Sequence, residues 1–114
     1  MSQQMQLARA LADEYRDRLS DWAALTCRPL FGGIGIWRGA HVFAIAWQGE
    51  LYFKVDDASR PDYEAAGSQP LHYVSRGKEQ ALKSFWAIPA HIADDDERLI
   101  LWAERAWQAA IAGV

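Results

Sequence analysis

The sequence is poor in the residues that extracellular proteins use for covalent cross-links. It has one cysteine, Cys27, among 114 residues, and a single thiol cannot form an intramolecular disulfide. The N-terminal residues also lack the basic stretch and apolar core of a secretory signal. These absences predict a cytoplasmic protein.

Long apolar runs and excess positive charge are also missing. The longest apolar run, residues 42–47, is far shorter than the roughly 20 residues that span a bilayer. Lys and Arg number 12 against 15 Asp and Glu, which gives a formal net charge of −3. Nucleic-acid binding normally requires a basic surface. We therefore expect neither a membrane protein nor direct nucleic-acid binding.

Motifs that carry catalysis or bind cofactors are scarce. The three histidines are scattered and show no metal-ligand spacing. The glycines of residues 32–35 lack the Lys-Ser/Thr of a phosphate loop and are followed by an apolar strand pattern; we expect them to allow a bulge or a close backbone approach. The acidic residues 94–97 lack the turn glycine of a calcium loop. The sequence predicts no catalytic residue, no cofactor and no metal.

Apolar residues, by contrast, are abundant. They make up 51% of the chain, charged residues make up 24%, and six residues are tryptophan. This composition is typical of a folded globular protein, and the length suits one hydrophobic core. We expect a single domain over residues 1–114.

Helical periodicity marks both ends of the chain. Apolar residues recur every three or four positions from Met5 to about Leu25, and again from Leu99 to Ala110. Asp94 and Glu97 have the spacing of a capping box, which predicts that the last helix begins near Asp94. Residues 59–66 predict a short connecting helix that Ser59 caps.

Between these helices the pattern is that of strands and hairpins. Short apolar runs are separated by glycine-containing turns, and they predict five strands over residues 34–37, 41–47, 51–55, 71–75 and 78–88. The expected fold is α+β, with an antiparallel sheet of about five strands flanked by the N-terminal and C-terminal helices.

The strand at residues 41–47 is apolar on both faces. Strict alternation directs Val42, Ala44 and Ala46 to one face and Phe43, Ile45 and Trp47 to the other. The two long helices then cover one face each, or a homodimer or another protein covers the second face. The candidate interaction surface comprises Trp37, Val42 and Ala44, with the basic side chains Arg76, Lys78 and Lys83.

Four segments together resemble one known family. They are residues 28–37 (RPLFGGIGIW), 50–56 (ELYFKVD), 63–68 (YEAAGS) and 85–89 (FWAIP). In order and spacing they resemble the TfoX N-terminal domain of the TfoX/Sxy competence regulators. Family members often have methionine where this chain has Leu30, a volume-conserving change in a core.

The resemblance implies a non-enzymatic regulatory domain. Full-length competence regulators carry a second, helical domain and assist the cyclic-AMP receptor protein at promoters, whereas this chain ends with its own helix and is expected to be a stand-alone version. We expect it to bind an unidentified protein partner. An alternative is a small ligand-binding module or enzyme whose pocket lies between sheet and helix near Cys27, His41 or His72.

Overall fold

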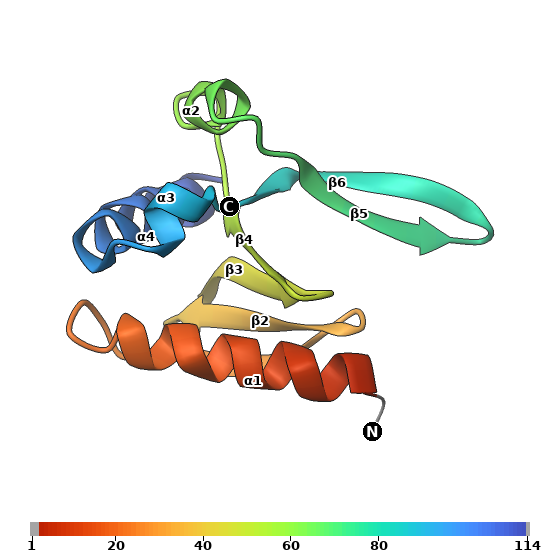
Figure 1. The fold of residues 1–114 in the computed structure, drawn as a ribbon, viewed down its shortest axis with the longest axis horizontal. Helices are drawn as coiled ribbons and strands as arrows, with labels where there is room; N and C mark the ends of the chain where they lie inside the picture. Colours follow the sequence, from red (N-terminus) through yellow and green to blue (C-terminus); the bar gives the residue numbers. More distant parts are fainter. Residues whose placement is uncertain (1–2, 114) are drawn as a thin grey trace.

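The computed structural model describes residues 3–113. Within that range the helices are α1 (Gln3–Arg18), α2 (Arg60–Ala65), α3 (Ala90–Ala93) and α4 (Asp96–Ala112). The strands are β1 (Thr26–Leu30), β2 (Gly33–Arg38), β3 (His41–Trp47), β4 (Glu50–Lys54), β5 (Pro70–Ser75) and β6 (Lys78–Ala87). Figure 1 shows the two long helices, α1 and α4, at the two ends of the chain.

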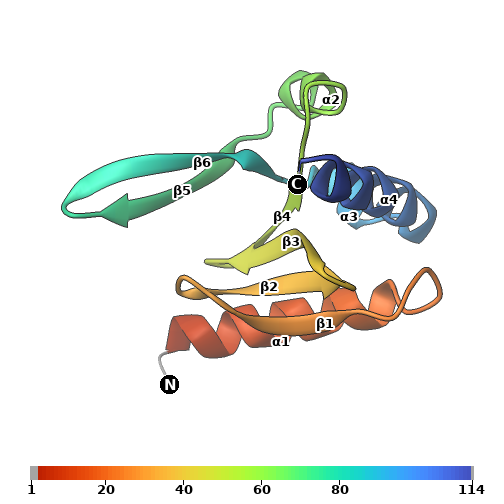
Figure 2. The same ribbon diagram turned by 180° about the vertical axis from the view of Figure 1, so that it is seen from behind.

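The strands form one open antiparallel sheet in the order β1-β2-β3-β4-β6-β5. The predicted α+β fold is therefore confirmed. Its five predicted strands are present, and β1 is an additional one beside β2 at the edge of the sheet (Figure 2). Pro29 lies inside β1; proline is tolerated here because β1 is an edge strand.

The ends of the helices differ from the prediction in one boundary and two caps. Helix α1 ends at Arg18 and not near Leu25, so the chain has residues 19–25 to cross to β1. The N-cap of α4 is Asp95, one residue after the expected Asp94. The Asp95 side chain accepts hydrogen bonds from the backbone N–H groups of Glu97 and Arg98. Ser59 does precede α2, but its hydroxyl accepts from the Asp56 N–H and does not cap the helix.

Both long helices pack on the same face of the sheet. Ala12 and Leu19 of α1 and Leu99 and Ala103 of α4 belong to one buried cluster with strand residues of β2, β3 and β4. The second face has its own buried cluster of Ile45, Leu71 and Phe85, to which no helix contributes. Of the two alternatives, one helix per face is therefore wrong, and cover of the second face by a homodimer or another protein stays a prediction.

A β-bulge explains why strict alternation fails in β3. Ile36 pairs with Ala44 but the next residue, Trp37, pairs with Val42, so Phe43 is the extra residue. Phe43 contacts Trp22 and Phe53 within the helix-side cluster, whereas Val42 lies with Ile45 on the second face. The predicted faces of Phe43 and Val42 were thus wrong, because a bulge re-aims side chains and leaves no mark in the apolar pattern.

The β5–β6 hairpin covers part of the second face. It extends away from the side of the sheet that carries α3 and α4 (Figures 1 and 2). Leu71 is fully buried, and Tyr73 and Leu82 pack against the same cluster as Ile45. The sheet is therefore curled, so that its late strands approach the turn between β1 and β2.

Candidate interaction surface

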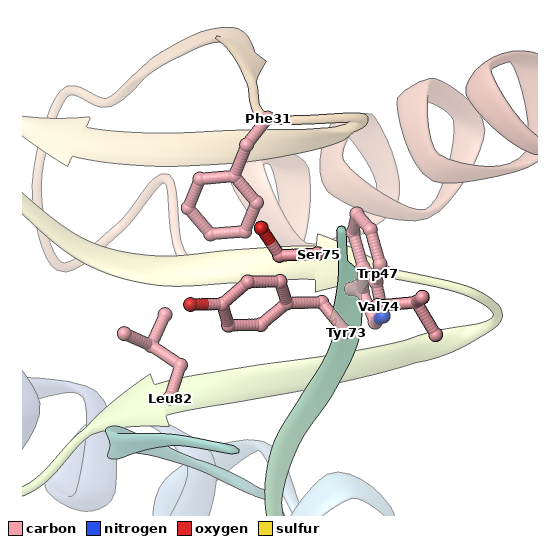
Figure 3. Close-up of a pocket in the computed structure, with 6 residues that line it drawn as sticks. All are labelled: Phe31, Trp47, Tyr73, Val74, Ser75 and Leu82. Carbon is pink, nitrogen blue, oxygen red and sulfur yellow. The ribbon is translucent and has the colours of Figure 1, made fainter. Parts of the chain in front are cut away.

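A pocket opens where the curled ends of the sheet meet. Its walls come from the β1–β2 turn, the end of β3 and the β5–β6 hairpin (Figure 3), and it has a volume of about 370 Å³. This volume is within the range of sites that hold a small ligand or a partner's side chain. We call it the aromatic pocket; it is lined by Phe31, Trp47, Tyr73, Val74, Ser75 and Leu82.

The β1–β2 turn presents Phe31 at the mouth of this pocket. Phe31 and Gly32 form a two-residue turn, since Leu30 pairs with Gly33. Phe31 has a φ of 32°, a strained conformation for a bulky residue. Its side chain is 51% exposed, although its ring centroid lies 6.1 Å from that of Tyr73. A large apolar side chain is thus held in solvent by a turn that fixes its direction.

Trp47 joins the two ends of the sheet beneath the pocket. Its indole Nε1 donates a hydrogen bond of 3.1 Å to the backbone carbonyl of His72, and its ring lies 5.9 Å from that of Phe31. Strand β3 and the Trp47 ring lie so close to Gly33 that a side chain would not fit there: a Cβ on Gly33 would lie 2.5 Å from the Ala46 carbonyl oxygen and 3.0 Å from the Trp47 ring. The close backbone approach expected of the glycine run is confirmed at Gly33.

The apolar residues of the predicted surface, Trp37, Val42 and Ala44, do not share one environment. Trp37 and Val42 are half-buried on the second face, and their part in an interaction surface stays a prediction. Ala44 is fully buried against the helices and cannot belong to any surface, so its inclusion was wrong. Strict alternation placed it beside Val42, and the bulge at Phe43 separates them.

The basic residues of the hairpin also separate. Arg76 lies in the turn, and Lys78 pairs with Ser75 on the pocket side of the hairpin. Lys83 instead lines a different cavity, together with Asp56, Asp57 and Arg60. The sequence could not show this division, because the side-chain direction depends on the register of β6 against β5.

Another basic residue, Arg28 of β1, lies on the second face of the sheet. The Arg28 guanidinium stacks over the Trp37 ring at 4.4 Å from Cζ to the centroid. Arg28 pairs with Gly35, and a Cβ on Gly35 would meet the Trp37 ring, which places all three on the same side of the sheet. Arg28, Arg76 and Lys78 are exposed. We call Arg76 and Lys78, which flank the hairpin turn next to Ser75, the basic rim.

The three residues of the enzyme alternative are not arranged around one pocket. The Cys27 thiol lies 3.8 Å from the Ala12 carbonyl of α1, and burial raises its pKa, which disfavours the nucleophilic thiolate. His72 is exposed on β5 and lines a separate shallow cavity with Gln48, Val74 and Glu79. Cys27 thus packs against α1 while His72 lies on the β5–β6 hairpin, and within the described residues no hydrogen bond joins the two side chains as a nucleophile and its base.

Two further findings concern metal binding and membrane-spanning helices. Within residues 3–113 no group of three or more His, Cys, Asp and Glu side chains is placed to hold a metal ion. In the same range no helix has the length and apolar character needed to cross a membrane. The aromatic pocket itself offers two hydroxyls, those of Tyr73 and Ser75, as its polar side-chain groups.

These features define an α+β domain whose helices cover one face of a curled sheet and whose other face carries an aromatic pocket. The family model described as the TfoX N-terminal domain matches residues 17–110. The chain therefore belongs to the TfoX N-terminal domain family, which confirms the resemblance. The match begins at the end of α1, spans every strand and runs into α4. No curated protein matches the chain.

Proposed function

We propose that this domain is a non-enzymatic regulatory module that acts in the cytoplasm by binding another protein through the second face of its sheet. The observation that carries the proposal is the aromatic pocket. Phe31 and Val74, both large and apolar, are 51% and 73% exposed at its rim, while Trp47, Tyr73 and Leu82 are half-buried within it.

Aromatic side chains in this setting are typical of binding surfaces. They are enriched at the centres of protein interfaces, where they supply a large contact area at a small cost in conformational entropy. Tyr73 and Trp47 are already oriented by contacts with Phe31 and His72. A partner would therefore meet a preformed surface and would not have to order it.

Site-specific photo-crosslinking in cells that make the protein tests the proposal. A photoreactive phenylalanine analogue replaces Val74 in one variant and Leu7 in another; Leu7 is also apolar and 52% exposed, but it lies on α1. We expect a discrete protein adduct, identified by mass spectrometry, from position 74 and none from position 7. Adducts at position 7 alone, or none at position 74, would contradict the proposal.

The homodimer stays a prediction. It was inferred from the need to cover the second face, and the β5–β6 hairpin meets part of that need within one chain. Sedimentation equilibrium at micromolar concentration distinguishes a dimer from a 12.9 kDa monomer.

A further inference from the structure

The open edge of β5 borders the aromatic pocket. β5 is the last strand of the sheet, and within residues 3–113 no strand lies beyond it. Natural edge strands are usually protected by charged residues or proline. After Pro70, the β5 residues Leu71, His72, Tyr73, Val74 and Ser75 include no Lys, Arg, Asp or Glu. This edge is therefore a template for one more strand.

The hairpin register shows which backbone groups face that edge. Ser75 pairs with Lys78 across the two-residue turn, and such flanking residues form a hydrogen-bonded pair. Hydrogen-bonded and non-hydrogen-bonded pairs alternate along an antiparallel ladder, so the backbone groups of His72 and Val74 point away from β6. The His72 carbonyl accepts from Trp47. Within the described chain, β5 has no neighbour that pairs with Val74 on this side.

The pocket lies directly beside this backbone. Val74 and Ser75 line it from β5, Leu82 lines it from the paired strand β6, and Phe31 lines it from the β1–β2 turn. A chain that pairs with Val74 thus passes the mouth of the pocket, and one of its side chains can enter. Because the lining is mainly aromatic and aliphatic, the side chain that fits is a large apolar one.

The charged side chains beside the pocket indicate which residues of the partner flank its apolar side chain. The whole chain is acidic, with a formal net charge of −3, yet the hairpin places two exposed cations, Arg76 and Lys78, next to Ser75 of the pocket. Glu79 follows Lys78 and, by strand alternation, points to the other face of the hairpin, where it lines a different cavity. Lys78 lies on the pocket side of the hairpin, opposite Ser75. Electrostatic complementarity at an interface favours a partner of the opposite sign and suppresses others.

We infer that the second face binds an extended acidic segment of a partner protein, which adds as a strand to the edge of β5 and inserts one large apolar side chain into the aromatic pocket. This inference rests on the proposed function and names the partner's chemistry. Backbone pairing at Val74 supplies the register, the pocket selects the apolar residue, and the basic rim selects acidic flanks.

A designed peptide provides a direct probe. It has about nine residues, enough to pass both ends of the open edge at roughly 3.3 Å per residue. A central phenylalanine is flanked on each side by threonine, valine and two aspartates, so the sequence is palindromic and can pair in either direction. Matched peptides replace the phenylalanine by alanine, or all aspartates by lysines.

Amide NMR spectra of the whole labelled protein report where each peptide binds. We expect the acidic phenylalanine peptide, at up to about 1 mM, to shift the amides of Phe31, Val74 and Ser75 in a saturable way. The alanine and lysine peptides should bind at least about tenfold more weakly, since each lacks one element of recognition. No saturable shift, shifts confined to the helices, or equal binding of the lysine peptide would overturn the inference.

Variants of the protein test the backbone pairing and the charge contacts separately. Val74→Pro removes the edge N–H but is tolerated in an edge strand, and it should abolish binding, whereas Val74→Ala keeps the N–H, loses only apolar contact and should weaken binding without abolishing it. Arg76→Glu with Lys78→Glu should weaken binding about tenfold, whereas Arg98→Glu, a charge reversal on α4, should not. If Val74→Pro lowers the melting temperature, the charge variants still decide the question; unchanged affinity in them would overturn the acidic assignment.

Other occupants give different outcomes. Binding of single-stranded oligothymidine at the pocket would replace the acidic segment by a nucleic acid, and concentration-dependent shifts of Val74 without peptide would replace it by a second copy of the chain; either overturns the inference. A protein crosslinked at position 74 in cells, together with no response to the peptides, would leave the proposed function standing and refute only the partner's chemistry.

Discussion

The guanidinium of Arg38 stacks on the indole of Trp107, with 3.9 Å from Cζ to the ring centroid. On its other side it approaches the Trp22 ring at 4.7 Å. Glu104 completes the cluster: its Oε1 accepts from Trp22 Nε1 at 3.2 Å and lies 3.8 Å from Arg38 Nη1. These contacts link the loop after α1, the end of β2 and helix α4, which are distant in sequence.

We predict that Arg38→Ala destabilises the fold by about 2 kcal/mol, because a partly desolvated cation loses two aromatic faces at once. Arg38→Lys should cost less, since it keeps the charge and loses the planar stack. Urea denaturation of both variants checks the order. A wild-type midpoint in Arg38→Ala would mean that the cluster contributes nothing to stability.

A second prediction concerns Gly35, because the Trp37 ring lies over it. A Cβ on Gly35 would be 2.4 Å from Cζ3 and 2.8 Å from Cη2 of Trp37. Alanine normally improves a strand position that glycine occupies, yet here Gly35→Ala should cost about 1–3 kcal/mol through overpacking. Trp37→Leu should remove most of that cost, so a double-mutant cycle should show clear non-additivity. Additive effects would contradict the stacked arrangement.

The sequence predicted the elements whose signals are local. The apolar period of α4 and the glycine turns of the hairpins were sufficient, because 3.6-residue and 2-residue periods depend only on neighbouring residues. Strand β1 was missed because Pro29 is a general strand breaker, and it is acceptable only at an edge that topology creates. The bulge at Phe43 was missed for a similar reason, since its apolar neighbours are compatible with either face.

The aromatic pocket could not be predicted at all. Phe31 and Tyr73 meet only because the sheet curls and β6 pairs with β4, which places β5 next to the β1–β2 turn. No local pattern encodes that approach. The sequence did indicate that the second face lacks a helix to cover it if both helices share the other face. It grouped Trp37, Val42 and Ala44 on that face, but only Trp37 and Val42 lie there, because the bulge at Phe43 directs Ala44 to the helices.

Tyr63 gives a pH-dependent prediction. Its side chain is 2% exposed and packs against Trp102 at 4.7 Å between ring centroids; burial raises its pKa well above the usual range, against the opposing charge of Arg105. Above about pH 10 the unfolded chain releases this proton and the folded chain keeps it, so stability falls by up to about 1.4 kcal/mol per pH unit. Below pH 10 neither state ionises and the effect is absent.

Urea unfolding of wild type and Tyr63→Phe between about pH 9 and pH 11 measures this loss. Burial also raises the pKa of Tyr15 and Tyr52, so the variant should show a shallower decline and not a flat one. Identical slopes in the two proteins would show that Tyr63 ionises as readily in the folded chain as in the unfolded one.

The chain should not bind duplex DNA appreciably at physiological salt. Non-specific affinity arises mainly when Lys and Arg neutralise phosphates and release counterions, so it depends on how many basic side chains share one surface. Arg76 and Lys78 are adjacent at the tip of the hairpin, but Lys83 lines another cavity beside Asp56 and Asp57.

Two neighbouring cations on a chain of net charge −3 would give only weak contacts that about 150 mM salt suppresses. The acidic start of α4, which includes Asp96 and Glu97, would repel a phosphate backbone that approached from that end. A fluorescence anisotropy titration with a labelled duplex decides the matter. Tight binding at that salt concentration, lost in an Arg76→Ala, Lys78→Ala, Lys83→Ala variant, would show that the three residues act as one phosphate-binding surface, and any effect of the domain at a promoter would then require no protein partner.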